Sequence, residues 1–424
     1  MTSTLMAAGA AVLIAFASPA RAQASADPAA IVSNYADIAL AGYSDSLTAA
    51  QELEAAIKAF LAAPSQEGLD AAKSAWLAAR PPYQQTEAYR FGNPVVDDWE
   101  GRVNAWPLDE GLIDYVDPSY GMESDENTLY TANVIANPSI EINGETVDAS
   151  VITPEFLSST LQEAGDIEAN VATGYHAIEF LLWGQDLNGT GPGAGARPWS
   201  DYDMANCTNG NCDRRGQYLS SAATLLVSDL KEIVAAWQAD GAARKALTGA
   251  EPKAGLAAML TGMGSLSYGE MAGQRMKVGL LLHDPEEEHD CFSDNTHQSH
   301  YFDAIGIRNV YLGSYERLDG GKAEGASLSQ LVAAMDPALD TEMRGKLDVS
   351  VARMQDIRDR VAAGEAYDQM IGEGNEAGNA AVEAAIGALI DQTKTIEKII
   401  AALDLGNIEL EGSDSLDNPD AVFK

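Results

Sequence analysis

The sequence predicts an all-α protein made of two helical-bundle-like halves with a cleft between them. Of its 424 residues, 46% are hydrophobic and only 7% are aromatic, and runs of β-branched residues are scarce, which favours helices over sheets. Apolar residues also recur every three or four positions over long stretches, as expected of helices that bury one face. A chain of this length is enough for two ordinary domains.

The N-terminal helical domain is predicted to cover residues 27–183. Its helical spacing is expected over three stretches, 31–61, 65–91 and 153–183. For the last stretch, an interruption at Gly165 is the alternative to a continuous helix. Pro81-Pro82 should break or kink the second stretch, because proline lacks the backbone donor that a helix needs. Residues 92–152 form an irregular insert in which Asn143-Gly144 indicates the turn of a short hairpin.

A linker and a C-terminal helical domain are predicted to follow. Residues 184–212 are rich in Gly, Pro and Asn, which makes them the best domain boundary in the sequence. The C-terminal domain covers 213–406, and the polar segment 407–424 is expected to be a flexible tail. Its helical stretches are 219–237, 254–282, 296–319, 326–336, 343–363 and 377–404. Both halves contain a helix with aromatic, acidic and Arg residues, which suggests a duplication.

Residues 1–22 are typical of a cleaved secretory signal peptide. An apolar run from Met6 to Ala17 precedes an A-x-A-like end at Ala20–Ala22. The run is too short for a membrane anchor, and the rest of the sequence has no stretch of 18 or more uninterrupted apolar residues. A buried N-terminal helix is the alternative. Secretion predicts a periplasmic or cell-envelope location.

The chain is strongly acidic, with 64 acidic and 26 basic residues and a formal net charge of −38. Such a chain repels phosphates, so nucleic acid is excluded as a partner. The acidic side chains either form a solvated surface that maintains solubility or produce a field that concentrates cations near the protein. The two interpretations are compatible.

The three cysteines are Cys207, Cys212 and Cys291. The first two flank an Asn-Gly turn signal in CTNGNC, and secretion favours a disulfide between them. The two further ligands that a structural zinc site requires are not found nearby. Cys291 then remains as a buried or weakly reactive thiol.

The stretch GYHAIEFLLWGQD (174–186) places His176 and Glu179 three positions apart inside an apolar run. Positions three apart lie on the same side of a helix, so the pair can present a nitrogen and a carboxylate to one metal ion. One or two further ligands would have to come from elsewhere. An internally hydrogen-bonded pair is the alternative. Neither H-E-x-x-H nor H-x-x-E-H fits around His176, so no complete zinc-peptidase motif is present.

Residues 286–300 are the second candidate region, because four of the five histidines lie in or beside them. His297 and His300 share one face of a helix that begins just before them. Asp290 and Asp294 add hard oxygen donors, which makes an ion site conceivable. A capped helix start with solvated side chains explains the same residues equally well.

Four stretches resemble the imelysin family, including its branch called iron-regulated protein A. Gly174, His176 and Glu179 fill the G-x-H-x-x-E motif of that family, and 75–92, 104–115 and 286–300 are similar to the branch. The resemblance implies an exported, all-helical protein of two bundle-like halves, with the H-x-x-E residues in a cleft between them. The family is filed among metallopeptidases, and it also contains iron-regulated proteins and periplasmic components of iron uptake.

The resemblance implies that His176 and Glu179 bind iron, another divalent or trivalent metal, or a metal chelate. Glu87 is the expected third metal ligand, although an ion pair with Arg90 would explain it as well. The residues expected to bind the rest of a ligand are Arg90, Arg275, Glu270, Asp294 and His297. For the two arginines, salt bridging is the alternative to holding a carboxylate-bearing ligand.

The predicted function is iron binding in iron acquisition, with an envelope iron-transport component as a partner. Two alternatives stay open. One is a metal-dependent peptidase of the imelysin type, which would need an open metal position and a general base. The other is a helical module whose cleft binds a ligand without metal.

Overall fold

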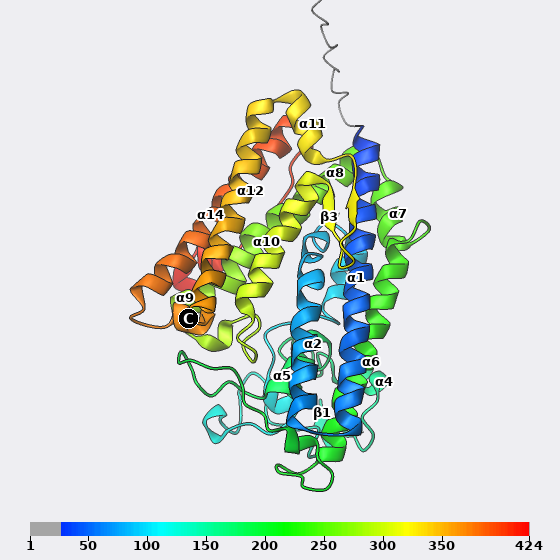
Figure 1. Ribbon diagram of the computed structural model, residues 1–424, viewed down its shortest axis with the longest axis vertical. Helices are drawn as coiled ribbons and strands as arrows, with labels where there is room; N and C mark the ends of the chain where they lie inside the picture. Colours follow the sequence, from blue (N-terminus) through cyan, green and yellow to red (C-terminus); the bar gives the residue numbers. More distant parts are fainter. Residues whose placement is uncertain (1–26, 424) are drawn as a thin grey trace, which may run out of the picture.

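The computed structural model describes residues 27–423, so the predicted signal peptide lies outside the described residues. The long helices form an array in which neighbours in space are often distant in sequence (Figure 1). They are α1 (Pro28–Ala62), α2 (Gln66–Gln84), α6 (Cys212–Trp237), α10 (Thr296–Leu312), α12 (Pro337–Ala362) and α14 (Glu376–Ala402). Helices α2 and α6 both pack along α1, whereas α10 lies between α2 and α12, and α14 packs on α12.

Shorter elements connect this array. The short α-helices are α3 (Pro94–Glu100), α4 (Pro154–Phe156), α5 (Gly174–Trp183), α7 (Ala242–Thr248), α8 (Pro252–Ser265), α9 (Val278–Leu282), α11 (Leu328–Met335), α13 (Tyr367–Ile371) and α15 (Asp414–Asp417). Two π-helical segments are η4 (Leu157–Leu161) and η6 (Leu266–Lys277). The 3-10 turns are η1 (Glu87–Tyr89), η2 (Glu110–Leu112), η3 (Pro118–Tyr120), η5 (Trp199–Tyr202), η7 (Pro285–Glu287) and η8 (Pro419–Ala421).

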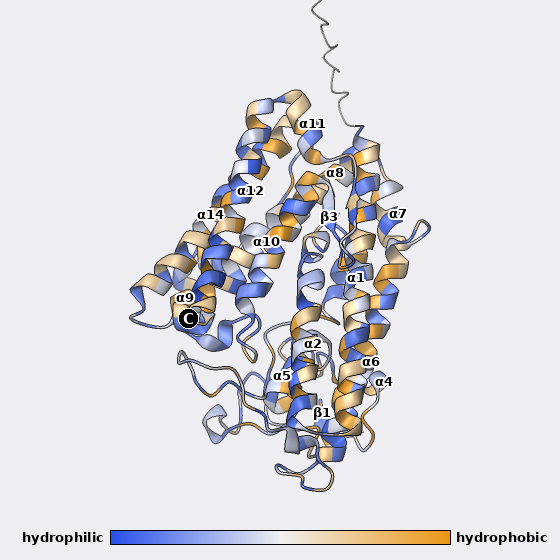
Figure 2. Ribbon diagram, viewed as in Figure 1, coloured by the Kyte–Doolittle hydropathy of each residue, from blue (hydrophilic) through white to orange (hydrophobic). Residues whose placement is uncertain are grey.

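Each long helix carries both hydrophilic and hydrophobic residues along its length, so one face is buried and another is solvated (Figure 2). Within the described residues, no helix is long and apolar enough to cross a membrane. Helix starts follow the expected chemistry: the Asp27 carboxylate accepts from the backbone of Ala29, and Pro28 takes the first helical position. The all-α prediction is therefore confirmed.

Two small antiparallel hairpins are the strands of the described chain. β1 (Ser139–Ile142) pairs with β2 (Glu145–Asp148) around the predicted Asn143-Gly144 turn, whose residues both have positive φ. β3 (Ser314–Glu316) pairs with β4 (Lys322–Glu324). The helix expected over 296–319 therefore ends at Leu312, because Gly313 turns into the left-handed region and the second hairpin follows.

Two further helix predictions need correction. The second helix passes through Pro81-Pro82, which lie in its last turn, but it ends at Gln84 rather than at residue 91. The stretch 153–183 is helical only at its two ends, so the alternative of an interruption at Gly165 holds and a continuous helix does not form. Glu163, Gly165 and Asp166 adopt positive φ, which interrupts the helix until α5 begins.

The expected boundary at 184–212 does not separate packing partners. Helix α6, assigned from sequence to the C-terminal domain, packs along α1, and one hydrophobic core extends through both groups of helices. Within this boundary segment, Cys207 and Cys212 form a disulfide. The segment after 406 is held to the body: Ser415 is buried and its hydroxyl donates to Gly273 O at 3.0 Å. This contact argues against the flexible tail predicted there.

Candidate metal centre

Helix α5 carries the His-x-x-Glu pair, and a glycine allows it to dock. Gly174 starts α5 with a φ of 77°, a conformation that favours glycine. A Cβ at this position would lie 2.3 Å from Val103 O, the carbonyl to which the Tyr175 N–H donates at 2.8 Å. The glycine therefore lets α5 approach the chain that follows α3 and brings His176 into the core.

His176 and Glu179 lie on one side of α5, as predicted. The distance from His176 Nδ1 to Glu179 Oε2 is 3.0 Å, and the side chains are 1% and 0% exposed. Glu179 Oε1 accepts hydrogen bonds from the backbone N–H and the hydroxyl of Ser293, at 3.0 and 2.7 Å. The pair is thus internally hydrogen-bonded, but His176 Nε2 has no partner among residues 27–423.

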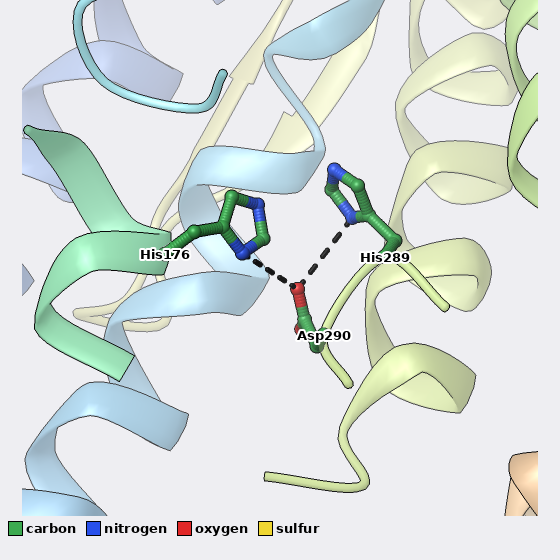
Figure 3. Close-up of side chains that lie close together, drawn as sticks. All are labelled: His176, His289 and Asp290. Atoms are coloured by element: carbon green, nitrogen blue, oxygen red, sulfur yellow. Dashed lines mark ion pairs between the residues drawn. The ribbon is translucent and has the colours of Figure 1, made fainter. Parts of the chain in front are cut away.

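The loop between α9 and α10 brings His289 and Asp290 to this pair. One possible ligand atom from each of His176, His289 and Asp290 lies within 4.8 Å of the other two (Figure 3). The two imidazole centroids are 4.8 Å apart, and both Nε2 atoms point away from Asp290 (Figure 3). Like that of His176, the Nε2 atom of His289 is buried without a hydrogen-bond partner in the described chain. Two imidazoles beside a carboxylate form a donor set that binds transition metals.

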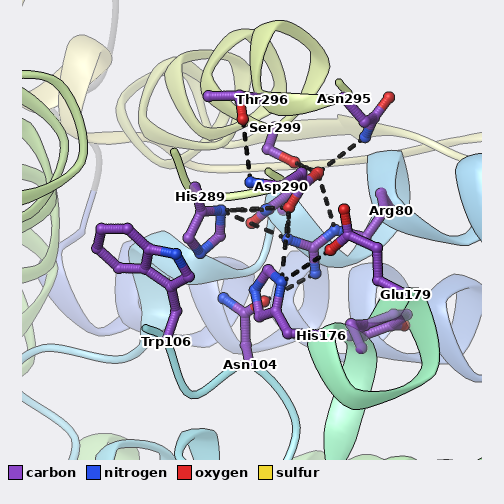
Figure 4. Close-up of polar contacts among 12 residues, drawn as sticks. Arg80, Asn104, Trp106, His176, Glu179, His289, Asp290, Asn295, Thr296 and Ser299 are labelled. Atoms are coloured by element: carbon purple, nitrogen blue, oxygen red, sulfur yellow. Dashed lines mark hydrogen bonds and ion pairs between the residues drawn. The ribbon is translucent and has the colours of Figure 1, made fainter. Parts of the chain in front are cut away.

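Arg80 on α2 provides the positive charge of the cluster (Figure 4). Its guanidinium donates to Asp290 Oδ1 at 2.7 Å and to Asn104 Oδ1 at 2.7 Å, and it is fully buried. Asn295 and Ser299 donate to the other oxygen of Asp290. The Asp290 carboxylate is therefore held in place from three sides.

Burial and the charge of Arg80 together determine the protonation of the cluster. Burial and the nearby Arg80 charge lower the pKa of His176 to about 3, and burial lowers the pKa of His289 well below its ordinary value. Both imidazoles are neutral at pH 7, which is the form that binds metal. Burial and then Asp290 raise the pKa of Glu179. Burial opposes the ionisation of Asp290, but Arg80 outweighs it and lowers that pKa to about 2.

Glu87, the expected third ligand, is not part of this cluster. Helix α2 ends before it, and its carboxylate accepts a hydrogen bond from Arg275 at 2.7 Å. Arg275 also pairs with Glu270 at 2.8 Å and Asp303 at 3.2 Å. Arg90 pairs with other carboxylates, including Glu270 at 3.8 Å. Four residues predicted to bind the metal or its ligand therefore belong to a separate ion network: Glu87, Arg90, Glu270 and Arg275.

Asp294 and His297 lie elsewhere again, at a surface pocket of about 520 Å³ between α2, α10 and α12. Ser293 and Asn295 also line this pocket. Because those two residues donate to Glu179 and Asp290, one layer of side chains separates the pocket from the cluster.

Sequence reasoning did not assign His289 or Arg80 to the metal centre, and it placed Asp290 in a separate ion site. All three lie in stretches that carry the family resemblance, 75–92 and 286–300. The spacing of residues within one helix, which revealed His176 and Glu179, gives no information on contacts between α2, α5 and a loop. The signal that could have connected Arg80, His289 and Asp290 with His176 is that all of them lie in stretches that resemble the imelysin family.

Comparison with known proteins agrees with these observations. Residues 39–396 match the imelysin family, described as Imelysin and designated peptidase M75. A 64-residue stretch is 38% identical to Iron-regulated protein A of Synechococcus elongatus, covering 15% of this chain and 18% of that protein. The match therefore spans less than a fifth of that relative.

Two solved structures share the fold. A protein described as an iron-regulated protein A precursor from Parabacteroides distasonis aligns with a TM-score of 0.64 at 19% identity, covering 92% of this chain and 97% of that one. An imelysin-like protein from Psychrobacter arcticum aligns with a TM-score of 0.56 at 15% identity, covering 90% and 99%. With the family match extending over most of its length, the chain belongs to the imelysin family.

Proposed function

We propose that this protein is an exported binding protein for iron or a small iron chelate, and that it acts in iron acquisition. The observation that carries the proposal is the pair of buried imidazoles, His176 and His289. Each has an Nε2 atom that makes no hydrogen bond to a described residue, while the Asp290 carboxylate lies on the Nδ1 side of both rings. Such nitrogen and oxygen donors suit iron, manganese and zinc alike. The names of the relatives support iron among these metals.

Each residue of the cluster has a role in this proposal. The two Nε2 atoms are the ligand atoms, because the Nδ1 side of His289 faces the Arg80 guanidinium at 3.5 Å, which repels a cation. Glu179, when ionised, accepts the Nδ1 proton of His176 and so leaves Nε2 free to bind, the usual arrangement around metal-bound histidine. Asp290 balances the charge of Arg80.

The remaining metal positions would be filled by water or by oxygen atoms of a chelate. Delivery to an iron-transport component of the envelope is the corresponding role in the cell.

Iron binding by variants tests the proposal. Demetallated protein is dialysed against iron(II) under nitrogen, and bound iron is measured per chain. We expect His176→Ala/His289→Ala to lose one bound equivalent and Glu179→Ala to bind that equivalent about 10- to 100-fold more weakly. The matched control is His297→Ala, which removes an imidazole outside the cluster and should leave binding unchanged. Unaltered iron content in the double variant would contradict the proposed centre.

A metal-dependent peptidase is the alternative that the family designation favours. It requires a free base beside a metal-bound water. In this structure, both oxygens of Glu179 are engaged, by His176 and by Ser293. Digestion of an unfolded substrate that disappears in His176→Ala/His289→Ala and with chelator would establish the peptidase instead.

A further inference from the structure

A pocket of about 510 Å³ adjoins Trp106, outside the proposed metal centre. Trp106 lines the pocket, and its ring also contacts the His289 ring, with 5.8 Å between the two centroids (Figure 4). The Trp106 Nε1–H donates to Glu288 O at 2.8 Å, which fixes this wall of the pocket. No residue of the proposed metal centre lines the pocket, so the two are separate.

Five acidic residues from three segments line this pocket, and we refer to it as the acidic pocket. They are Asp109 and Glu110 at the start of η2, Asp186 after α5, and Glu286 and Glu287 in η7. No Lys, Arg or His among the described residues lines the pocket, so this part of the chain supplies no counter-charge there. A pocket with this charge attracts cations and repels anions.

Glu110 distinguishes this pocket from a solvated group of surface acids. The residue is only 4% exposed, it lines the pocket, and it forms no ion pair with any residue from 27 to 423. Burial raises the pKa of its carboxyl group to about 7. Because a buried carboxylate is costly unless a cation compensates it, the pocket is the place where a cation from outside the chain can lie.

Aromatic rings form another wall of the acidic pocket. Tyr120 and Tyr130 both line it, and their rings are stacked with centroids 4.1 Å apart and planes 10° apart. The Tyr130 hydroxyl donates to Tyr120 O at 3.1 Å, which holds the two rings together. A Cβ at Gly111 would collide with Tyr130 O, so the glycine after Glu110 allows this aromatic pair to approach the carboxylates. Aromatic faces attract cations.

The geometry of the acidic pocket suits an organic cation better than a metal ion. In the described chain, the group of three His, Cys, Asp or Glu residues whose ligand atoms lie within 4.8 Å of one another is His176, His289 and Asp290, and none of these lines the pocket. The carboxylates of the pocket therefore do not converge in threes. They are distributed over several walls, which matches a ligand whose positive charges are spaced along a carbon chain. The volume is also within the range of about 300–1,000 Å³ that is usual for small-molecule sites.

We propose that the acidic pocket binds a small organic cation with two or more ammonium groups, of the linear polyamine class. Glu110 and Glu286, which belong to different walls, pair with the ammonium groups. Trp106, Tyr120 and Tyr130 contact the carbon chain and the charged nitrogens. The site shares no residue with the proposed iron centre and does not depend on it.

Calorimetric titration with spermidine tests the site. The full mature chain is demetallated and titrated at physiological ionic strength, where weak attraction to the acidic surface is screened. We expect one saturable equivalent, bound at least about 10-fold more weakly by Glu110→Gln/Glu286→Gln, because two charge-assisted hydrogen bonds are lost. The matched control Glu373→Gln/Glu376→Gln removes two exposed carboxylates elsewhere and should bind as the natural protein does. Equal weakening in the two variants, or none in the first, overturns the proposal.

Two further measurements locate the ligand and identify its class. Tyr130→Leu keeps an apolar side chain but removes the aromatic face, and should weaken spermidine binding by about 2- to 5-fold. Cys291, the free cysteine of the chain, lines the acidic pocket, so bound spermidine should slow its alkylation by iodoacetamide. Magnesium chloride at the same ionic strength should not slow it. Alkylation that spermidine leaves unchanged, or that magnesium slows equally, overturns the proposal.

The variant His176→Ala/His289→Ala separates this site from the proposed iron centre. It should bind spermidine with natural affinity whether or not it has lost iron. Failure of the iron centre therefore leaves this result unchanged, whereas loss of spermidine binding in this variant overturns the independence of the acidic pocket.

Discussion

The Arg80 cluster and the Arg275 cluster are both buried networks of charged side chains, but they differ in how completely they are paired. Around Arg275, the carboxylates of Glu87, Glu270 and Asp303 all lie within 3.2 Å of the guanidinium. Around Arg80, Asp290 supplies the single paired carboxylate among residues 27–423, and the adjoining imidazoles keep nitrogens without a partner in that range. One network is fully paired, whereas the other retains buried nitrogens that make no hydrogen bond to a described residue.

The comparison shows that buried charge alone does not identify a binding site. Glu87, Glu270 and Arg275 were attractive as ligands because they are ionisable residues on predicted helices. In the structure their charges neutralise one another, which is the salt-bridging alternative for Arg275 and leaves little capacity for a ligand. The unpaired Nε2 atoms of the histidines are the better guide.

Removing the central cation of the Arg275 network should have the largest effect. Arg275→Met leaves three carboxylates near one another with no guanidinium among them, and breaking a buried ion pair in this way costs about 3–5 kcal/mol. Urea unfolding of the metal-free protein measures the loss. Its matched control is Arg353→Met, which breaks an exposed pair with Asp356 and should cost about 0.5 kcal/mol or less. Equal losses in the two variants would remove the distinction between structural and exposed pairs.

Displacing α5 should lower the free energy of unfolding by less than Arg275→Met does. It should disturb the Arg80 cluster and leave the Arg275 cluster in place. Gly174→Ala places a Cβ against the Val103 carbonyl and forces alanine into a positive φ, at a cost of about 1–3 kcal/mol. Since His176 moves with α5, iron binding should weaken as well. Gly387→Ala is the control, because a Cβ there meets nothing within 4 Å. Gly174→Ala with natural stability and natural iron affinity would show that this close approach does not position the site.

Much of the fold follows from local patterns in the sequence. The seams of α1, α6 and α14 repeat every three or four residues, and the Asn143-Gly144 turn was visible as a dipeptide. The missed boundaries depend on single residues in unusual conformations. Gly165 indicated an interruption in a stretch whose apolar spacing is helical, but the positive φ of Glu163 and Asp166, which lengthens the interruption, is not visible in that spacing.

The site was predictable only in part, for a related reason. His176 and Glu179 lie one helical turn apart, so local geometry determines their relation. Arg80 and Asp290 are separated by 210 positions and meet through the packing of α2 against the loop before α10. Periodicity describes one element at a time, so it left Glu87 as the expected partner of His176 instead.

The pH dependence of stability should separate the two networks in the metal-free protein. The pKa of His176 is about 3 in the folded chain and about 6.5 when unfolded, so below pH 6.5 the unfolded state binds a proton that the folded state does not. His176 therefore lowers stability progressively as the pH falls from about 6.5 to about 3, by about 1 kcal/mol for each pH unit.

In Glu270, burial opposes ionisation but Arg275 outweighs it and lowers the pKa, so this group loses its stabilising contribution only below its ordinary pKa. Urea unfolding at pH 7, 6 and 5 should show a shallower decline for His176→Gln than for the natural protein, and an unchanged decline for Glu270→Gln. Parallel curves for His176→Gln and the natural protein would mean that this imidazole does not stay neutral in the folded core.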